Sequence, residues 1–240
     1  MRLGKVSGIS FDLDDTLWPF EVVVERAEAT LHAWLLENAP KTASVLPAPQ
    51  ALAQLRAEYE RSRPDLAGDF RALRIGSISL ALELAKEDVT LADLAYDVFY
   101  SARHQVEFFE DVMPALHWLS ARFPLVAVTN GNADLRLTGG GEFFRAALSA
   151  SSVGVAKPEA EIFHAAARAV EVAPAEMLHV GDDYHLDVLG ALDAGFQAAW
   201  LVRRNRLEIA RVEKNTREPH LTIRDLSMLC EALGGPGSLS

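Results

Sequence analysis

The residues most capable of chemistry are acids at the end of a short apolar segment near the N-terminus, in the sequence Asp12-Leu13-Asp14-Asp15-Thr16. Residues two apart on an extended chain point to the same side, so Asp12 and Asp14 can face one site. Such a pair can divide the work of group transfer, with one carboxylate ionised as a nucleophile and the other protonated as an acid. A turn or a helix cap is the simpler alternative for these acids. A calcium loop does not fit, because Leu17 and Val23 occupy the positions that require glycine and glutamate.

Two further groups could bind an anion. Thr129-Asn130-Gly131-Asn132 follows the apolar residues 125–128, and a hydroxyl beside the free amides of a glycine-containing turn forms a neutral phosphate cradle. Asn-Gly is also typical of a hairpin turn, although the residues that follow lack strand-like alternation. Lys157 precedes Pro158, which favours an extended residue before it and suits the first position of a helix. Lys157 is therefore expected to project from a helix start, although a lone lysine is more often a solvated surface group.

A fourth group, Gly181-Asp182-Asp183 with Asp187 further along the chain, follows the apolar residues 177–180. A helix cap explains one of these aspartates but not three. If they share a site with Asp12 and Asp14, the carboxylates repel one another strongly unless a cation lies among them. A hard divalent ion with oxygen ligands meets this requirement, and Mg²⁺ is the usual ion where phosphate is also bound. His179, inside the preceding apolar segment, is expected to be a packed residue rather than a ligand.

The elements that must position these groups alternate between helix and strand in the second half of the chain. The patterns predict, in order, helix at 115–123, strand at 125–128, helix at 162–170, strand at 177–180, helix at 186–194 and strand at 196–202. Such alternation, with a first strand around residues 9–13, is typical of an α/β protein whose parallel sheet carries helices on both faces.

The block from residue 20 to residue 109 has helical periodicity throughout. Its last helix is expected to begin at a capping box formed by Thr90 and Asp93. This block would be an insertion at the carboxyl end of the first strand, the edge where open α/β sheets bind ligands.

The composition excludes some classes of binding partner. The 240 residues include 23 basic and 34 acidic side chains, a formal charge of −11, which argues against a nucleic-acid partner. The single cysteine, Cys230, forms no internal disulfide, and no apolar stretch reaches the roughly 18 residues of a membrane helix. We therefore expect a cytoplasmic protein without membrane association, either a monomer or a homodimer.

The order FDLDDTL, VTNGN, GVAKPEAEIF and HVGDDYHLDVLGALDAG resembles the four motifs of the haloacid dehalogenase-like (HAD) superfamily. The resemblance implies a Rossmann-like, doubly wound parallel sheet formed by residues 1–19 and 110–240, with a helical cap domain at residues 20–109 that shapes the substrate pocket. The stretches PLVAVTNGNADL and LHVGDDYHLDVLGALDAGFQAAWLVRRN are also similar to a bacterial branch that hydrolyses flavin mononucleotide and a phosphoribitylamino-uracil intermediate of riboflavin synthesis.

The resemblance also implies catalytic roles. Asp12 would be the nucleophile that becomes an aspartyl phosphate, and Asp14 the general acid and then base. Thr129 and Lys157 would hold the phosphoryl group. Mg²⁺ would be bound by Asp12, the backbone carbonyl of Asp14, and Asp182.

Other residues have less defined roles. Asp183 and Asp187 would lie next to the ion or orient Lys157. Asn130 and Gly131 belong to the expected phosphate cradle. Trp18 could stack on a flat substrate ring, or it could pack between the cap and the sheet.

The function expected from these features is Mg²⁺-dependent hydrolysis of a small-molecule phosphate monoester. The family's haloacid dehalogenases lack the second carboxylate of the first motif, so Asp14 favours phosphate chemistry. A phosphomutase or another HAD-type hydrolase is the alternative within the family. A receiver-like phospho-signalling module is the non-enzymatic alternative.

Overall fold

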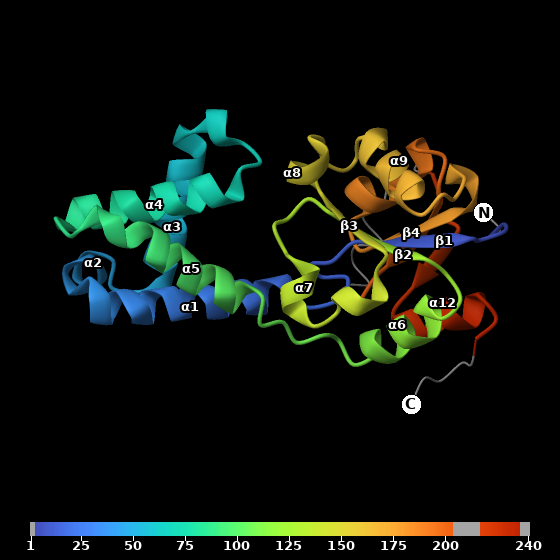
Figure 1. The fold of residues 1–240 in the computed structure, drawn as a ribbon, viewed down its shortest axis with the longest axis horizontal. Helices are drawn as coiled ribbons and strands as arrows, with labels where there is room; N and C mark the ends of the chain where they lie inside the picture. The colour runs from blue at the N-terminus through green and yellow to red at the C-terminus, as the bar shows by residue number, and fades with distance from the viewer. Residues whose placement is uncertain (1–2, 204–216, 236–240) are drawn as a thin grey trace. The chain divides into compact units, whose positions relative to one another are not determined.

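The computed structural model describes residues 3–203 and 217–235 (Figure 1). The chain divides into two compact units, of which the first combines Met1–Pro19 with Glu107–Ser240 and the second is Phe20–Val106. The sequence predicted the second junction at residues 109 and 110, and the structure has it at residues 106 and 107.

The first unit is built on a parallel sheet with the strand order β3-β2-β1-β4-β5-β6. In the described residues its six strands are β1 (Gly8–Phe11), β2 (Leu125–Thr129), β3 (Ala146–Ser149), β4 (Met177–Gly181), β5 (Gln197–Leu201) and β6 (Leu221–Ile223). Every residue of β1, β2, β4 and β5 is buried, as expected for parallel strands covered on both faces. The predicted α/β class and doubly wound, Rossmann-like architecture are confirmed.

Helices cover both faces of this sheet. Figure 1 shows α9 (Ala160–Ala169) on one face, with α6 (Val112–Ser120) and α12 (Leu226–Ala232) on the other. The short helices are α7 (Leu135–Thr138), α8 (Ala150–Val153) and α10 (Gly190–Asp193). Phe163 of α9 packs in one buried cluster with Val126 and Trp200 of the sheet, so α9 and the sheet share a hydrophobic core.

Three local details differ from the sequence prediction. The strands β3 and β6 were not predicted, and the Ala-Ala-Leu-Ser sequence of β3 has little intrinsic strand preference, so its pairing with β2 defines it. The helix expected at 186–194 is a π-helical turn over Tyr184–Leu189 followed by α10. The helix expected to begin at Pro158 begins at Ala160.

The second unit consists of helices, namely α1 (Phe20–Asn38), α2 (Pro40–Val45), α3 (Pro49–Ser62), α4 (Phe70–Ala85) and α5 (Ala92–Arg103). Leu31 and Leu35 of α1 join Ile78 and Leu82 of α4 and Phe99 of α5 in its core. Their spacing is the i, i+4 period of helices that bury one face.

The predicted capping box is absent from the start of α5. The Thr90 backbone N–H and hydroxyl both donate to the Asp88 carboxylate, at 2.9 and 2.8 Å, so Asp88 rather than Thr90 is the capping residue of this segment. A 3₁₀ turn over Val89–Leu91 precedes the helix as a result.

In the described part of the chain, no helix combines the length and the apolar character needed to cross a lipid bilayer.

Candidate active site

The carboxyl ends of β1, β2 and β4 bring the predicted groups together. β1 pairs with β2 on one side and with β4 on the other, and the Asp12 backbone N–H continues the ladder to the Val180 carbonyl at 2.9 Å. Asp12, Thr129 and Asp182 each follow or end one of these three adjacent strands. Parallel pairing therefore places residues from distant parts of the sequence at one sheet edge.

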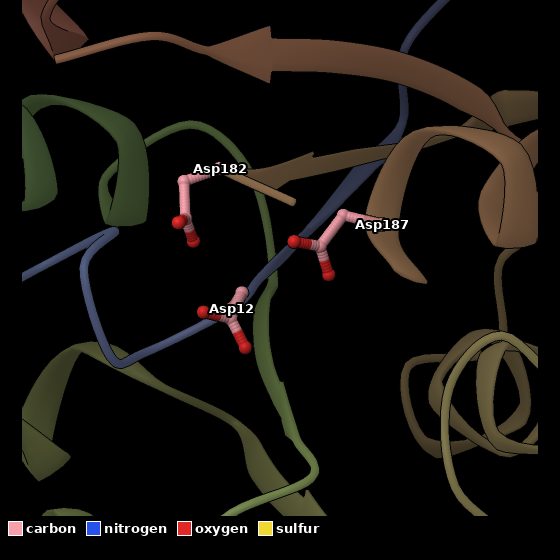
Figure 2. Close-up of side chains that lie close together, drawn as sticks. All are labelled: Asp12, Asp182 and Asp187. Atoms are coloured by element: carbon pink, nitrogen blue, oxygen red, sulfur yellow. The ribbon is translucent and has the colours of Figure 1, made fainter. Parts of the chain in front are cut away.

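Three carboxylates converge at this edge (Figure 2). Asp12, Asp182 and Asp187 each offer one oxygen, and these oxygens lie within 4.8 Å of one another. Burial raises the pKa of Asp12 to about 7, with a further contribution from Asp187. Burial raises the pKa of Asp182 to about 8, and Asp12 and Asp187 add to the effect. Two of the three carboxyl groups thus resist ionisation. A divalent cation bound among them would favour their ionised form.

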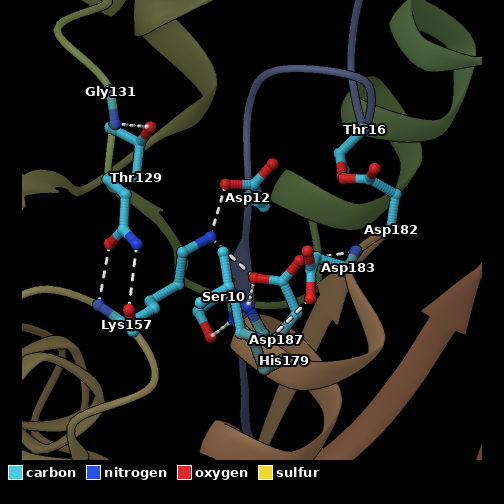
Figure 3. A network of polar contacts seen from close by, with 12 residues as sticks. Ser10, Asp12, Thr16, Thr129, Gly131, Lys157, His179, Asp182, Asp183 and Asp187 are labelled. Atoms are coloured by element: carbon cyan, nitrogen blue, oxygen red, sulfur yellow. Dashed lines mark hydrogen bonds and ion pairs between the residues drawn. The ribbon is translucent and has the colours of Figure 1, made fainter.

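Lys157 is the buried cation of the site. Its Nζ donates to Asp12 Oδ1 at 2.5 Å and to Asp187 Oδ1 at 2.6 Å (Figure 3), and only 4% of the residue is exposed. Burial opposes the charge of this amine, but the carboxylates of Asp12 and Asp187 outweigh it and raise the pKa of Lys157. Lys157 is therefore held as an ammonium ion against the predicted nucleophile.

Asp187 accepts hydrogen bonds from Lys157 and from the backbone of the turn in which it lies. Its Oδ2 accepts the Asp183 backbone N–H at 3.0 Å, and His179 Nε2 lies 3.1 Å from its Oδ1. Although burial works against ionisation, Lys157 and His179 lower the pKa of Asp187 below its ordinary value. Of the two roles left open for Asp187, this geometry favours the orientation of Lys157.

Gly181 makes the approach of Asp187 possible. A Cβ atom at Gly181 would lie 2.3 Å from Cγ of Asp187, which is too close for any non-bonded pair. A residue with a side chain would displace Asp187.

Asp183 caps the turn that carries Asp187. Its Oδ1 accepts the backbone N–H groups of His185 and Leu186, at 2.7 and 2.8 Å. These bonds tie the Asp183 carboxylate to the start of the π-helical turn, which is the capping role that the sequence allowed for one aspartate.

Asp14 lies in the loop after β1 and is oriented by Trp18. The Trp18 Nε1–H donates to Asp14 Oδ1 at 2.8 Å. Trp18 has no exposed surface, and its ring makes an edge contact with Phe108 at a centroid distance of 5.5 Å. The stacking on a substrate that the sequence suggested for Trp18 disagrees with this placement, because the ring is packed inside the protein and its polar end is used by Asp14.

The residues of the predicted phosphate cradle make two different sets of hydrogen bonds. The Gly131 backbone N–H donates to Thr129 Oγ1 at 2.9 Å, which uses an oxygen lone pair and not the hydroxyl hydrogen of Thr129. The side chain of Asn130 instead bonds the Lys157 backbone, donating to its carbonyl at 2.9 Å and accepting its N–H at 2.7 Å. Asn130 thus fixes the segment that carries Lys157, with both its side-chain nitrogen and its oxygen bonded to the Lys157 backbone.

Arg203 also lies near the carboxyl ends of the strands, and its role was not predicted from the sequence. Its Nε and Nη2 donate to the Thr16 carbonyl at 3.0 and 2.8 Å, and its Nη1 donates to Asp111 at 2.8 Å. Thr16 Oγ1 in turn donates to Asp182 Oδ1 at 3.2 Å. Arg203 therefore holds the loop after β1 that carries Asp14. No pattern in the sequence could reveal this role, because its main acceptor is a backbone carbonyl.

Comparisons with known proteins agree on the family. The family model described as "Hydrolase: haloacid dehalogenase-like hydrolase" matches residues 6–195. The chain is 32% identical over 231 residues to the 5-amino-6-(5-phospho-D-ribitylamino)uracil phosphatase YigB of Escherichia coli (strain K12), covering 95% of this chain and 96% of that protein. It is 31% identical over 202 residues to the glyceraldehyde 3-phosphate phosphatase of Methanopyrus kandleri, covering 79% of this chain and 81% of the relative.

A solved structure supports the same assignment. The 2-haloacid dehalogenase from Pseudomonas syringae pv. Tomato DC3000 superimposes with a TM-score of 0.82 at 36% identity, covering 95% of this chain and 98% of that one. The match of the family model over most of the chain, together with these relatives, shows that the chain belongs to the haloacid dehalogenase-like hydrolase family.

Proposed function

We propose that this protein hydrolyses a small-molecule phosphate monoester in a Mg²⁺-dependent reaction that passes through an aspartyl phosphate on Asp12. Its class, an HAD-type phosphoric monoester hydrolase, follows from the family and from the phosphatases among its relatives. The metal ion, the covalent intermediate and the substrate are the parts of the proposal that go beyond this class. The observation that carries the proposal is the Asp12 carboxylate, held by Lys157 at 2.5 Å within a cluster of acids that lacks enough positive charge.

In the proposed reaction, a carboxylate oxygen of Asp12 attacks phosphorus and the bond from phosphorus to the ester oxygen breaks. Asp14 donates a proton to the departing alcohol. Asp14 then accepts a proton from water, the water oxygen attacks the phosphorus of the aspartyl phosphate, and inorganic phosphate leaves as Asp12 is regenerated. Lys157 and the hydroxyl of Thr129 would bind the oxygens of the phosphoryl group.

The residues present fit a divalent cation. Asp12, the backbone carbonyl of Asp14, and Asp182 would hold Mg²⁺, because they supply the hard oxygen donors that this ion prefers. When bound, the ion would offset the repulsion among the carboxylates and lower the charge that an incoming phosphate dianion meets.

The helical unit Phe20–Val106 is proposed to be the cap that selects the substrate. The 32% identity to a 5-amino-6-(5-phospho-D-ribitylamino)uracil phosphatase extends over 95% of the chain and so includes this unit. This favours a sugar-alcohol phosphate that carries a flat nitrogenous ring, such as that uracil compound or flavin mononucleotide.

A 2-haloacid dehalogenase is the second candidate, because a structure described by that name is 36% identical to this chain. A halide leaves without needing a proton, so a dehalogenase has no use for the acid that Asp14 provides. Trp18 holds Asp14 in place with a hydrogen bond of 2.8 Å, which supports an acid–base role and therefore the phosphatase.

The experiment that tests the proposal compares the two chemistries on one enzyme preparation. We expect phosphate release from p-nitrophenyl phosphate and from the phosphoribitylamino-uracil, dependent on Mg²⁺ and abolished by EDTA, and no chloride release from 2-chloropropionate. Chloride release without phosphate release would support the dehalogenase and overturn the proposal. Phosphate release that survives EDTA would overturn the metal requirement alone.

A further inference from the structure

Behind Lys157, a line of buried polar side chains continues away from the expected substrate position (Figure 3). Ser10 of β1 and His179 of β4 are direct partners in the register of the two strands, and both are buried. Ser10 Oγ lies 2.8 Å from His179 Nδ1, and His179 Nε2 lies 3.1 Å from Asp187 Oδ1. Lys157 then links Asp187 to Asp12.

The chemistry of these groups fixes the direction of each hydrogen bond. Asp187 is an ionised carboxylate and can only accept, so the hydrogen of His179 must be on Nε2. Burial lowers the pKa of His179, which keeps the imidazole neutral, and the ring makes a T-shaped contact with Phe163 at a centroid distance of 5.0 Å. Nδ1 of a neutral ring is then an acceptor, and it receives the hydroxyl hydrogen of Ser10.

Three hydrogen bonds set the orientation of the Asp187 carboxylate. Its Oδ1 receives Lys157 Nζ and His179 Nε2, while its Oδ2 receives the Asp183 backbone N–H. With donors on both oxygens the carboxylate has one orientation, and Lys157 is aimed at Asp12. Without His179, Asp187 would keep Lys157 and the Asp183 N–H but lose one of the two donors that hold Oδ1 in line with Lys157.

We propose that His179, in the Nε2–H tautomer that Asp187 requires, is a positioning residue that acts through Asp187 to aim Lys157 at the reacting carboxylate. This inference rests on the proposed function, because Lys157 has to meet a phosphoryl group for its aim to matter. His179 touches neither Asp12 nor the substrate and is not itself a catalytic residue.

Two substitutions separate positioning from packing. His179→Met has a similar size but no donor, whereas His179→Gln can place an amide N–H near the position of Nε2. We expect His179→Met to lower kcat for p-nitrophenyl phosphate by roughly 10- to 100-fold with a much smaller change in KM, and His179→Gln to recover most of the loss. His164→Met is the matched control, because His164 donates Nε2–H to the Ala194 carbonyl at 3.0 Å outside this network. It should lower thermal stability without changing kcat.

The tautomer provides a readout that does not depend on activity. In protein labelled with ¹⁵N-histidine, the signals absent from His179→Gln identify His179, and we expect them to show Nε2 protonated and Nδ1 bare at neutral pH. Ser10→Ala removes the donor to Nδ1 but leaves Asp187 in place, so it should keep this tautomer and lower kcat less than His179→Met does.

A protonated Nδ1 with a bare Nε2 would overturn the proposal, and so would a kcat for His179→Met equal to that of the parent. Equal losses of kcat in the Met and Gln variants would show that His179 is only a packing residue, which would also overturn the proposal. A parent enzyme without phosphatase activity would refute the proposed function, and the tautomer alone would then decide whether His179 donates to Asp187.

Discussion

The two units of the molecule each bury charge, and they do so differently. In the helical unit, Arg74 of α4 donates to Glu28 of α1 at 2.6 Å and lies over the Phe99 ring at 3.8 Å. One cation faces one carboxylate in that pair. In the sheet unit, the single amine of Lys157 faces Asp12 and Asp187, and Asp182 is within reach of both acids.

The balance of charge distinguishes a structural ion pair, in the helical unit, from a candidate active site, in the sheet unit. Burying a charge is costly unless it is paired, and in Arg74 and Glu28 each charge has one opposite charge as its partner. The sheet unit leaves negative charge uncompensated. Burial, with a smaller contribution from the neighbouring carboxylates, raises the pKa values of Asp12 and Asp182 to about 7 and about 8. This unbalanced cluster is the part of the protein that a bound cation would stabilise.

The strongest test of this contrast is Asp12→Asn. The amide has the same shape but cannot form an acyl phosphate, so turnover should fall by roughly 10⁴-fold or more. The metal-free protein should be at least as stable to urea as the parent, because one of the repelling carboxyl groups is gone. Full activity in the variant would remove Asp12 from its proposed role.

The next largest effect should come from Asp182. Asp182→Ala should lower kcat by at least about 100-fold and raise the Mg²⁺ concentration needed for half-maximal rate. Titration with Mg²⁺, with p-nitrophenyl phosphate as substrate, measures both quantities. An unchanged Mg²⁺ requirement would show that Asp182 is not a ligand.

The unbalanced cluster should also show in the pH dependence of stability. Carboxyl groups with raised pKa values hold protons in the folded state that the unfolded state has released, so the metal-free protein loses stability as pH rises from about 4 to about 8. Mg²⁺ has to displace those protons at low pH. Its effect on the melting temperature should therefore be larger near pH 8.5 than near pH 6, and an equal or opposite effect would contradict the assignment of Asp12 and Asp182 as ligands.

A smaller effect is expected at Trp18. Trp18→Phe keeps an aromatic ring but removes the N–H that orients Asp14, which should lower kcat roughly tenfold. Because the ring is buried, flavin mononucleotide and p-nitrophenyl phosphate should be affected alike. A rise in KM for the flavin substrate alone would restore the stacking role suggested by the sequence.

The smallest net effect should come from removing the balanced pair of the helical unit. Arg74→Met alone leaves Glu28 buried without its cation and should cost about 3–5 kcal/mol of stability. The double variant with Glu28→Leu should return to within about 2 kcal/mol of the parent in urea unfolding. A double variant as unstable as the single one would mean that the pair is more than an isolated ion pair.

The sequence predicted the location of the site because acids, a threonine and a lysine follow apolar strands, and parallel strands bring their carboxyl ends together. The partners of these groups were harder to infer. His179 looked like a packed strand residue, and only the register of β1 and β4 pairs it with Ser10. The aromatic character of Trp18 suggested a contact surface, but periodicity does not say which way a ring in a loop faces. β3 was missed because tertiary pairing overrides its weak local preference.

The central claim, covalent catalysis by Asp12, is tested most directly by mass spectrometry of enzyme quenched in acid during turnover of p-nitrophenyl phosphate with Mg²⁺. We predict one phosphoryl group on the peptide that contains Asp12, absent when EDTA replaces Mg²⁺ and absent from Asp12→Asn. A phosphoryl group on another residue, or steady turnover by Asp12→Asn, would contradict the account.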